Sequence, residues 1–153
     1  MAVEASISKF KKNNLKIYIV LCICLAGWCI YDGYFNEGWI EEHTNADGSQ
    51  QAYLVVNRNA PPYLIGAAVL LAVYLLVIRN RKIIADESEL VIGDKVKIPY
   101  DSIQKIDKTR FKSKGIFIIT HKNDQGREVN RKISDRTYDN LEALLDELVA
   151  KIS

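Results

Sequence analysis

Residues 15–34 read LKIYIVLCICLAGWCIYDGY, and residues 62–78 read PYLIGAAVLLAVYLLVI. The hydrocarbon core of a bilayer is about 30 Å thick, and a helix of roughly 20 apolar residues crosses it. The charged residues of the first stretch, Lys16 and Asp32, lie near its ends, and the second stretch has none. The sequence therefore predicts two transmembrane helices, over residues 15–34 and 62–79, with Pro61 and Pro62 at the start of the second.

Two other interpretations of these stretches were weighed. A soluble protein could bury both as core helices, but the residues that follow are too few to cover two helices that are apolar on every face. A cleaved signal peptide would explain the lysines before the first stretch, but no cleavage site of the A-x-A type follows it. An uncleaved membrane anchor is the better prediction.

The charges predict how the helices are oriented. Lys and Arg total 21 against 19 Asp and Glu, a net charge of +2, which is too balanced for a general nucleic-acid binder. Lysines gather before the first helix, and Arg79, Arg81 and Lys82 follow the second, whereas four carboxylates and Arg58 lie between them. The positive-inside rule places both termini in the cytoplasm. We expect an integral protein of a bacterial inner membrane.

Small residues recur along both predicted helices. In the first helix they follow helical spacing, and the three cysteines form neither a zinc motif nor a disulfide framework. Because small residues let helix backbones approach closely in lipid, we expect a packing face. Its members are Cys22, Ala26, Cys29, Gly33, Gly66, Ala68 and Ala72.

The loop between the helices predicts a β-hairpin. Residues 40–44 and 52–56 flank a turn-rich segment, 45–49, that contains Asp47-Gly48. The expected organisation is a basic N-terminal segment (1–14), a first helix (15–34), an outer loop (35–61), a second helix (62–79) and a cytoplasmic domain (80–153).

The domain should be built from short antiparallel strands and one helix. Turn signals separate β-prone segments at 81–85, 89–92, 95–99, 102–111, 116–121 and 127–133. Asp139 and Glu142 form a capping box for a final helix. That helix carries one apolar stripe, formed by Leu141, Leu144, Leu145, Leu148 and Ile152.

The run Lys97-Ile98-Pro99-Tyr100-Asp101-Ser102-Ile103, with the short strands and the final helix, resembles bacterial membrane-anchored pleckstrin-homology-like (PH-like) domains. The resemblance covers about residues 82–152. It implies a small β-barrel or sandwich capped by a C-terminal α-helix, with a non-catalytic binding role. Lipid-binding relatives place basic residues between their first two strands. Here the segment 86–89 is acidic, which argues against inositol-phosphate recognition.

Four basic residues recur at a spacing of two from the predicted fourth strand into the turn after it. They are Lys108, Arg110, Lys112 and Lys114, and a strand would place the first three on one face. This basic stripe could contact the anionic inner leaflet, contact an acidic partner protein, or be a solvated face.

No arrangement of residues predicts catalysis. The only two histidines, His43 and His121, are expected on opposite sides of the membrane, and no hydrolase, phosphate-loop or zinc-protease motif occurs. We expect no enzyme, cofactor or metal. The predicted function is a membrane-anchored adaptor or accessory subunit of a membrane protein complex, which binds partners through its domain and its transmembrane hairpin. The alternative is a module that binds or senses anionic lipid.

Overall fold

The computed structural model describes residues 2–93 and 95–152. Met1, Asp94 and Ser153 lie outside this description. Asp94 falls in a predicted turn, and the other two are the end residues of the expected segments 1–14 and 80–153. The chain forms two compact units. One unit contains residues 1–12 and 77–153 and is called the domain; the other contains residues 13–76 and is called the hairpin.

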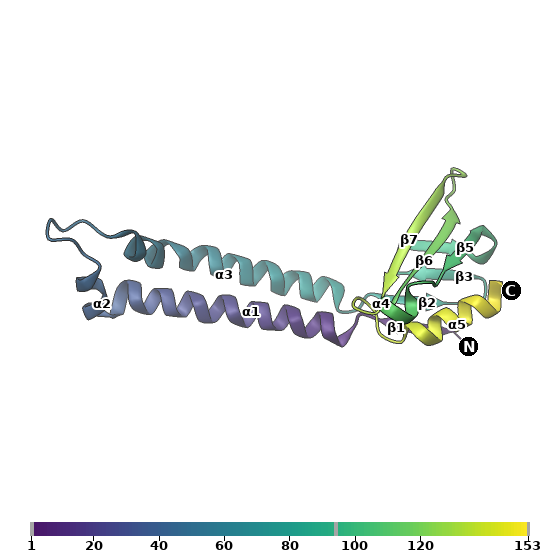
Figure 1. The fold of residues 1–153 in the computed structure, drawn as a ribbon, viewed down its shortest axis with the longest axis horizontal. Helices are drawn as coiled ribbons and strands as arrows, with labels where there is room; N and C mark the ends of the chain where they lie inside the picture. The colour runs from purple at the N-terminus through teal and green to yellow at the C-terminus, as the bar shows by residue number, and fades with distance from the viewer. Residues whose placement is uncertain (1, 94, 153) are drawn as a thin grey trace. The chain divides into compact units, whose positions relative to one another are not determined.

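The hairpin is built from two long helices, α1 (Lys9–Ile30) and α3 (Ala52–Ile78) (Figure 1). Among the described residues, two helices are long and apolar enough to cross a membrane. They are α1, extended by the π-helical turn Tyr31–Phe35, and α3. In the most apolar 18-residue stretch of each helix, only 6% of the residues of the first and 17% of those of the second are buried. A core helix of a soluble protein would be mostly buried, so the exposed apolar surface fits a bilayer.

The start of the second helix differs from the prediction. Pro61 and Pro62 lie inside α3, which begins at Ala52. Leu54, Pro61 and Ala68, spaced seven residues apart, are all buried. This repeat keeps one face of the helix covered well before the prolines.

The outer loop is helical rather than a β-hairpin. The segment predicted as its first strand belongs largely to a short helix, α2 (Glu37–Glu42), which begins where the side chain of Asn36 accepts the N–H of Trp39 (3.3 Å). The predicted second strand forms the first turns of α3. The turn itself is present, because the N–H of Asn45 donates to the carbonyl of Ser49 (2.9 Å).

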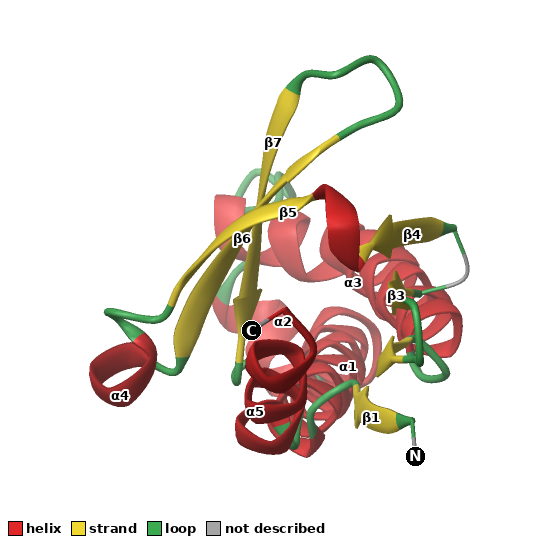
Figure 2. Cartoon of the chain, turned by 90° about the vertical axis from the view of Figure 1, so that its right-hand side faces the viewer, coloured by secondary structure: helices red, strands yellow, loops and turns green. Residues whose placement is uncertain are grey.

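The described part of the domain contains two antiparallel sheets (Figures 1 and 2). The first has the order β1-β2-β3-β4, and the second has the order β5-β6-β7. The strands are β1 (Val3–Ser6), β2 (Lys82–Ala85), β3 (Glu89–Ile92), β4 (Val96–Pro99), β5 (Ile103–Asp107), β6 (Ile116–Lys122) and β7 (Glu128–Ser134). All six predicted strands are present, but no ladder joins the two sheets among the described residues, so of the expected barrel or sandwich no closed barrel is formed.

Strand β1 was missed because it lies in the segment expected to be only a basic N-terminus. It pairs with β2 in register Ala5↔Ile83, and Ala5 is fully buried. The whole hairpin is therefore inserted between two neighbouring strands of one sheet. The residues before α1 and after α3 must lie on the same side of any bilayer that the helices cross.

Helix α5 (Leu141–Ile152) packs against β1 and β2, and its buried leucines join one core with both sheets. Leu144 and Leu148 are fully buried, as the apolar stripe predicts. The predicted cap is wrong: the carboxylate of Asp139 accepts the N–H of Lys9 (3.0 Å), at the start of α1. Asn140, with φ of 61°, precedes α5, and its carbonyl accepts the N–H of Leu144 (3.3 Å).

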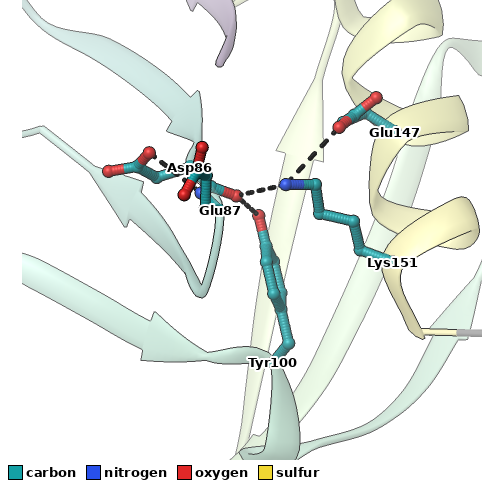
Figure 3. A network of polar contacts seen from close by, with 5 residues as sticks. All are labelled: Asp86, Glu87, Tyr100, Glu147 and Lys151. Carbon is teal, nitrogen blue, oxygen red and sulfur yellow. Dashed lines mark hydrogen bonds and ion pairs between the residues drawn. The ribbon is translucent and has the colours of Figure 1, made fainter. Parts of the chain in front are cut away.

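Tyr100 links α5 to the turn between β2 and β3 (Figure 3). Its hydroxyl donates to the carbonyl of Asp86 (2.6 Å), and the ammonium of Lys151 donates to the same carbonyl (2.9 Å). Lys151 also lies 3.6 Å from Glu147 and 5.8 Å from the centroid of the Tyr100 ring. Burial, with the nearby carboxylates of Glu147, Asp86 and Glu89, raises the pKa of Tyr100. In this chain the Ile-Pro-Tyr run therefore has a structural role.

Candidate functional site

The predicted basic stripe is not a strand face. Strand β5 ends at Asp107, whose carboxylate accepts both the N–H (3.0 Å) and the hydroxyl (2.7 Å) of Thr109. The chain then forms the four-residue helix α4 (Phe111–Lys114). Asx turns of this kind compete with strand pairing, so the period of two is lost. The four basic residues divide into Lys108 and Arg110 in the turn, and Lys112 and Lys114 on α4.

Gly115 ends α4 and directs the chain into β6. Its φ is 62°, a left-handed conformation that favours glycine, and its N–H donates to the carbonyl of Phe111 (2.8 Å). Its carbonyl accepts the N–H of Asp135 (2.9 Å). A Cβ at this position would overlap the Asp135 carboxylate. Gly115 thus holds α4 close to the segment that follows β7.

An open cavity of about 870 Å³ lies between α4, the segment after β7 and the first turn of α1. We call it the basic pocket. Its lining includes Phe10, Phe111, Lys112, Lys114, Asp135 and Arg136. A neighbouring cavity of about 630 Å³ shares Ser113, Lys114 and Arg136 with it and adds Lys132. Basic side chains from two segments, 112–114 and 132–136, are thereby gathered on one surface.

The first turn of α1 is bound to the wall of this pocket. The buried hydroxyl of Ser8 donates to the carbonyl of Arg136 (2.8 Å), and its backbone N–H donates to the carbonyl of Thr137 (2.8 Å). The same hydroxyl oxygen accepts the N–H of Lys11 (3.1 Å) and so caps α1. The position of Phe10 beside Arg136 is therefore fixed by hydrogen bonds as well as by the chain.

Between the described residues, no ion pair within 4.0 Å involves a basic side chain of the basic pocket. The ion pairs between described residues are Lys82–Glu4, Lys97–Glu89 and Lys151–Glu147, all elsewhere in the domain. Asp135 is the one acidic residue in the lining of either cavity, and its carboxylate lies over Gly115. Four basic residues against one acidic residue make the two cavities attractive to an anion.

Sequence reasoning included Lys112 and Lys114 but missed three members of this surface. Arg136 and Lys132 are brought there by the β6–β7 pairing, for example Ile116↔Ser134, which no local pattern predicts. Phe10 offered a signal, because it is an aromatic residue between Lys9 and Lys11, close to the start of the apolar stretch. The signal is weak, because the aromatic residues typical of membrane interfaces are Trp and Tyr.

The hairpin has a cluster of polar side chains at the C-terminal end of α1. Asp32 is 8% exposed and lies in the π-helical turn Tyr31–Phe35. Its carboxylate accepts the indole N–H of Trp28 (2.5 Å) and the side-chain amide of Asn36 (3.0 Å). Both carboxylate oxygens are thereby hydrogen-bonded, which lowers the free-energy cost of burying this charged group.

Residues next to this cluster connect the two long helices. Pro61 and Pro62 have no N–H, so the carbonyls of Asn57 and Arg58 lack their usual helical donors. The Tyr34 hydroxyl donates to the Arg58 carbonyl (3.2 Å), and the Arg58 Nε donates to the Gly33 carbonyl (2.8 Å). The prolines therefore leave an acceptor free, and the hydroxyl of Tyr34 in the π-helical turn satisfies it.

The small residues of the predicted packing face differ in burial. Ala26, Gly33 and Ala68 are buried, and Cys22, Cys29 and Ala72 are half-buried. A Cβ on Gly33 would lie 3.3 Å from the backbone of Asn57. Gly66 is exposed, and a Cβ there would meet nothing within 4 Å. Close approach of the helices thus involves Gly33 and not Gly66.

Within residues 2–93 and 95–152, no group of three or more His, Cys, Asp or Glu side chains is placed to hold a metal ion. No protein-family model matches the sequence, no curated protein matches it, and no solved structure matches the fold. The functional argument therefore rests on the geometry described above.

Proposed function

We propose that the chain is a non-catalytic, membrane-anchored adaptor or accessory subunit of a membrane protein complex. The observation that carries this proposal is the insertion of the hairpin between β1 and β2. A domain joined to its anchor by two strands of its own sheet is held at the membrane surface more firmly than one on a single linker. This is the property that an adaptor needs to present a binding surface at a fixed depth.

We propose that the domain faces the cytoplasm of a bacterial cell. The pairing of β1 with β2 puts both flanks of the hairpin on one side, and both flanks are basic. The outer loop carries Glu37, Glu41, Glu42 and Asp47. The positive-inside rule then assigns the domain to the cytoplasmic side of the inner membrane.

We also propose a PH-like domain. Four strands in one sheet, three in a second and a C-terminal helix support this proposal. The acidic segment 86–89 connects β2 and β3, whereas the connection between β1 and β2 is the hairpin itself. The acidic segment therefore carries no argument about a ligand between the first two strands.

The adaptor proposal is tested with the full chain, tagged at the C-terminus, extracted in a mild detergent and weighed by native mass spectrometry. We expect a second protein in stoichiometric amount. Ala5→Asp, which puts a charge into the fully buried β1 position, should abolish this association. Ser6→Asp, at the next and exposed position of β1, should preserve it. A wild-type chain that is recovered alone, or only as a homo-oligomer, would contradict the proposal.

Anionic-lipid binding remains the second candidate function. The four-residue stripe no longer supports it, because the structure separates those residues. The basic pocket supports it instead, since its cationic side chains lie beside an aromatic residue of α1.

A further inference from the structure

We propose that the basic pocket binds the phosphate headgroup of an anionic phospholipid, in the leaflet where α1 begins. This inference deepens the second candidate function and rests on the proposed membrane location of the hairpin. It does not depend on whether a protein partner exists.

Depth is the first argument. Phe10 lines the pocket, and the apolar stretch of α1 begins five residues later, at Leu15. At 1.5 Å per residue, this places Phe10 about 7.5 Å from the start of the apolar stretch. The headgroup layer of one leaflet is about 5–7.5 Å thick. The pocket therefore includes a residue at the depth where phospholipid phosphates lie.

Chemical character is the second argument. Phe10 is 61% exposed, although it is a large apolar side chain at the edge of a cationic cavity. A large apolar ring beside ammonium and guanidinium groups matches a phospholipid, which joins a charged phosphate to apolar chains. Lys112 and Lys114 come from α4, and Arg136 comes from the segment after β7. They can approach one phosphate from different directions.

Rigidity is the third argument. The carbonyl of Arg136 accepts the Ser8 hydroxyl, and the Gly115 carbonyl accepts the Asp135 N–H. The backbones of both basic segments are thus fixed relative to Phe10. A preformed site loses less conformational entropy on binding than a flexible basic tail does.

A free phosphate compound would satisfy the same cations, but it would gain nothing from Phe10. A lipid presents both parts at once and is confined to the layer where Phe10 lies. The geometry therefore favours the lipid over a soluble anion. Asp135, which lies over Gly115 in the same pocket, opposes either ligand equally.

The test uses the full chain in detergent, titrated with phosphatidylglycerol or with zwitterionic phosphatidylcholine and followed by native mass spectrometry. We expect the wild type to retain phosphatidylglycerol preferentially. Replacing Lys112, Lys114 and Arg136 together by Gln should weaken phosphatidylglycerol binding by about a hundredfold. Each basic residue near an anionic surface strengthens binding by about fivefold, and three are removed. Lys105, Lys108 and Arg110 are also exposed and lie outside both cavities, so their replacement by Gln is a control of equal charge. This control variant should bind nearly as the wild type does.

Equal weakening of lipid binding in both triple variants would show an effect of net charge and overturn the proposed site. No weakening in either variant would also overturn it. Circular dichroism melting checks that both variants fold. A second variant, Phe10→Ser, should weaken lipid retention, whereas Phe35→Ser, which changes a 70%-exposed aromatic residue at the other end of the helix, should not.

An excess of inorganic phosphate or glycerol phosphate should leave the bound lipid in place. Displacement by either compound in the wild type would identify a site for soluble phosphate and overturn the lipid assignment. Because the probe is a defined lipid and the adaptor test reads a second protein, failure of one proposal is distinguishable from failure of the other.

Discussion

Large apolar side chains are buried in the domain, whereas many are exposed in the hairpin. Phe117 and Leu148 of the domain are fully buried, while Trp28 and Leu70 of the hairpin are 70% and 72% exposed. What the hairpin does bury includes small or polar residues, such as Ala26, Gly33 and Asp32. Similar side chains thus occupy opposite environments in one chain. The difference fits a domain that buries its apolar side chains away from water and a hairpin whose exposed apolar helices could cross a membrane.

A buried charge should separate the two environments most strongly. Leu148→Asp places a carboxylate in the core of the domain and should unfold it, at a cost above about 4 kcal/mol. Leu70→Asp should leave the melting of the domain unchanged and instead reduce membrane insertion of α3, by about 3 kcal/mol at mid-helix. Limited proteolysis of the domain and carbonate extraction of the full chain report the two effects. Equal loss of domain protection in both variants would contradict the division.

The junction between the two environments should be the next most sensitive place. Ser8→Ala removes the cap of α1 and leaves the Arg136 carbonyl without its donor, which together should destabilise the domain by about 2 kcal/mol. Ser6→Ala, in the neighbouring exposed position, should have little effect. Thermal unfolding of the full chain in detergent compares them. An unchanged midpoint for Ser8→Ala would mean that β1 and the first turn of α1 are not stably docked.

How far the sequence predicts this molecule differs between the two environments. The apolar stretches and six strands were found because composition and alternation are local properties. Strand β1 was not found, since Val3–Ser6 is short and its partner β2 lies beyond the entire hairpin. For the same reason Asp139 was assigned to its own helix, although its carboxylate accepts the N–H of Lys9.

The candidate site was predicted only in part for a related reason. Lys112 and Lys114 were identified, but as members of a stripe with a period of two, which the Asx turn at Asp107 and the helix α4 interrupt. Arg136 joins them through sheet pairing. The sequence predicts a helix start at Pro61 and Pro62, because it does not reveal that Tyr34 satisfies a carbonyl they leave free.

Glycine substitutions can sharpen the comparison inside the hairpin. Gly33→Ala would bring a Cβ to 3.3 Å from the backbone of Asn57 and should loosen the helix pair by about 1 kcal/mol. Gly66→Ala meets no neighbour and should stabilise α3 by up to about 1 kcal/mol, because alanine favours helix. Cysteine cross-linking between the two helices in a bilayer measures their approach. If both substitutions shifted the cross-linking between the helices in the same direction, that result would contradict the packing described here.

The smallest expected effect tests the polar seam of the domain. Tyr100→Phe removes the hydrogen bond to the Asp86 carbonyl and should cost about 1 kcal/mol in the free energy of unfolding near neutral pH. The pKa of Tyr100 is raised from its ordinary value of 10.0, so the folded state favours the protonated phenol. That contribution is fully present below pH 10.0 and is lost as the pH rises through the higher pKa of the folded state. Denaturant unfolding above pH 10.0 should therefore weaken the wild type more than Tyr100→Phe, and parallel pH curves would contradict the assignment. Because the hairpin lies outside this network, Tyr100→Phe should leave cross-linking between α1 and α3 unchanged, which makes it a domain-side control for Gly33→Ala.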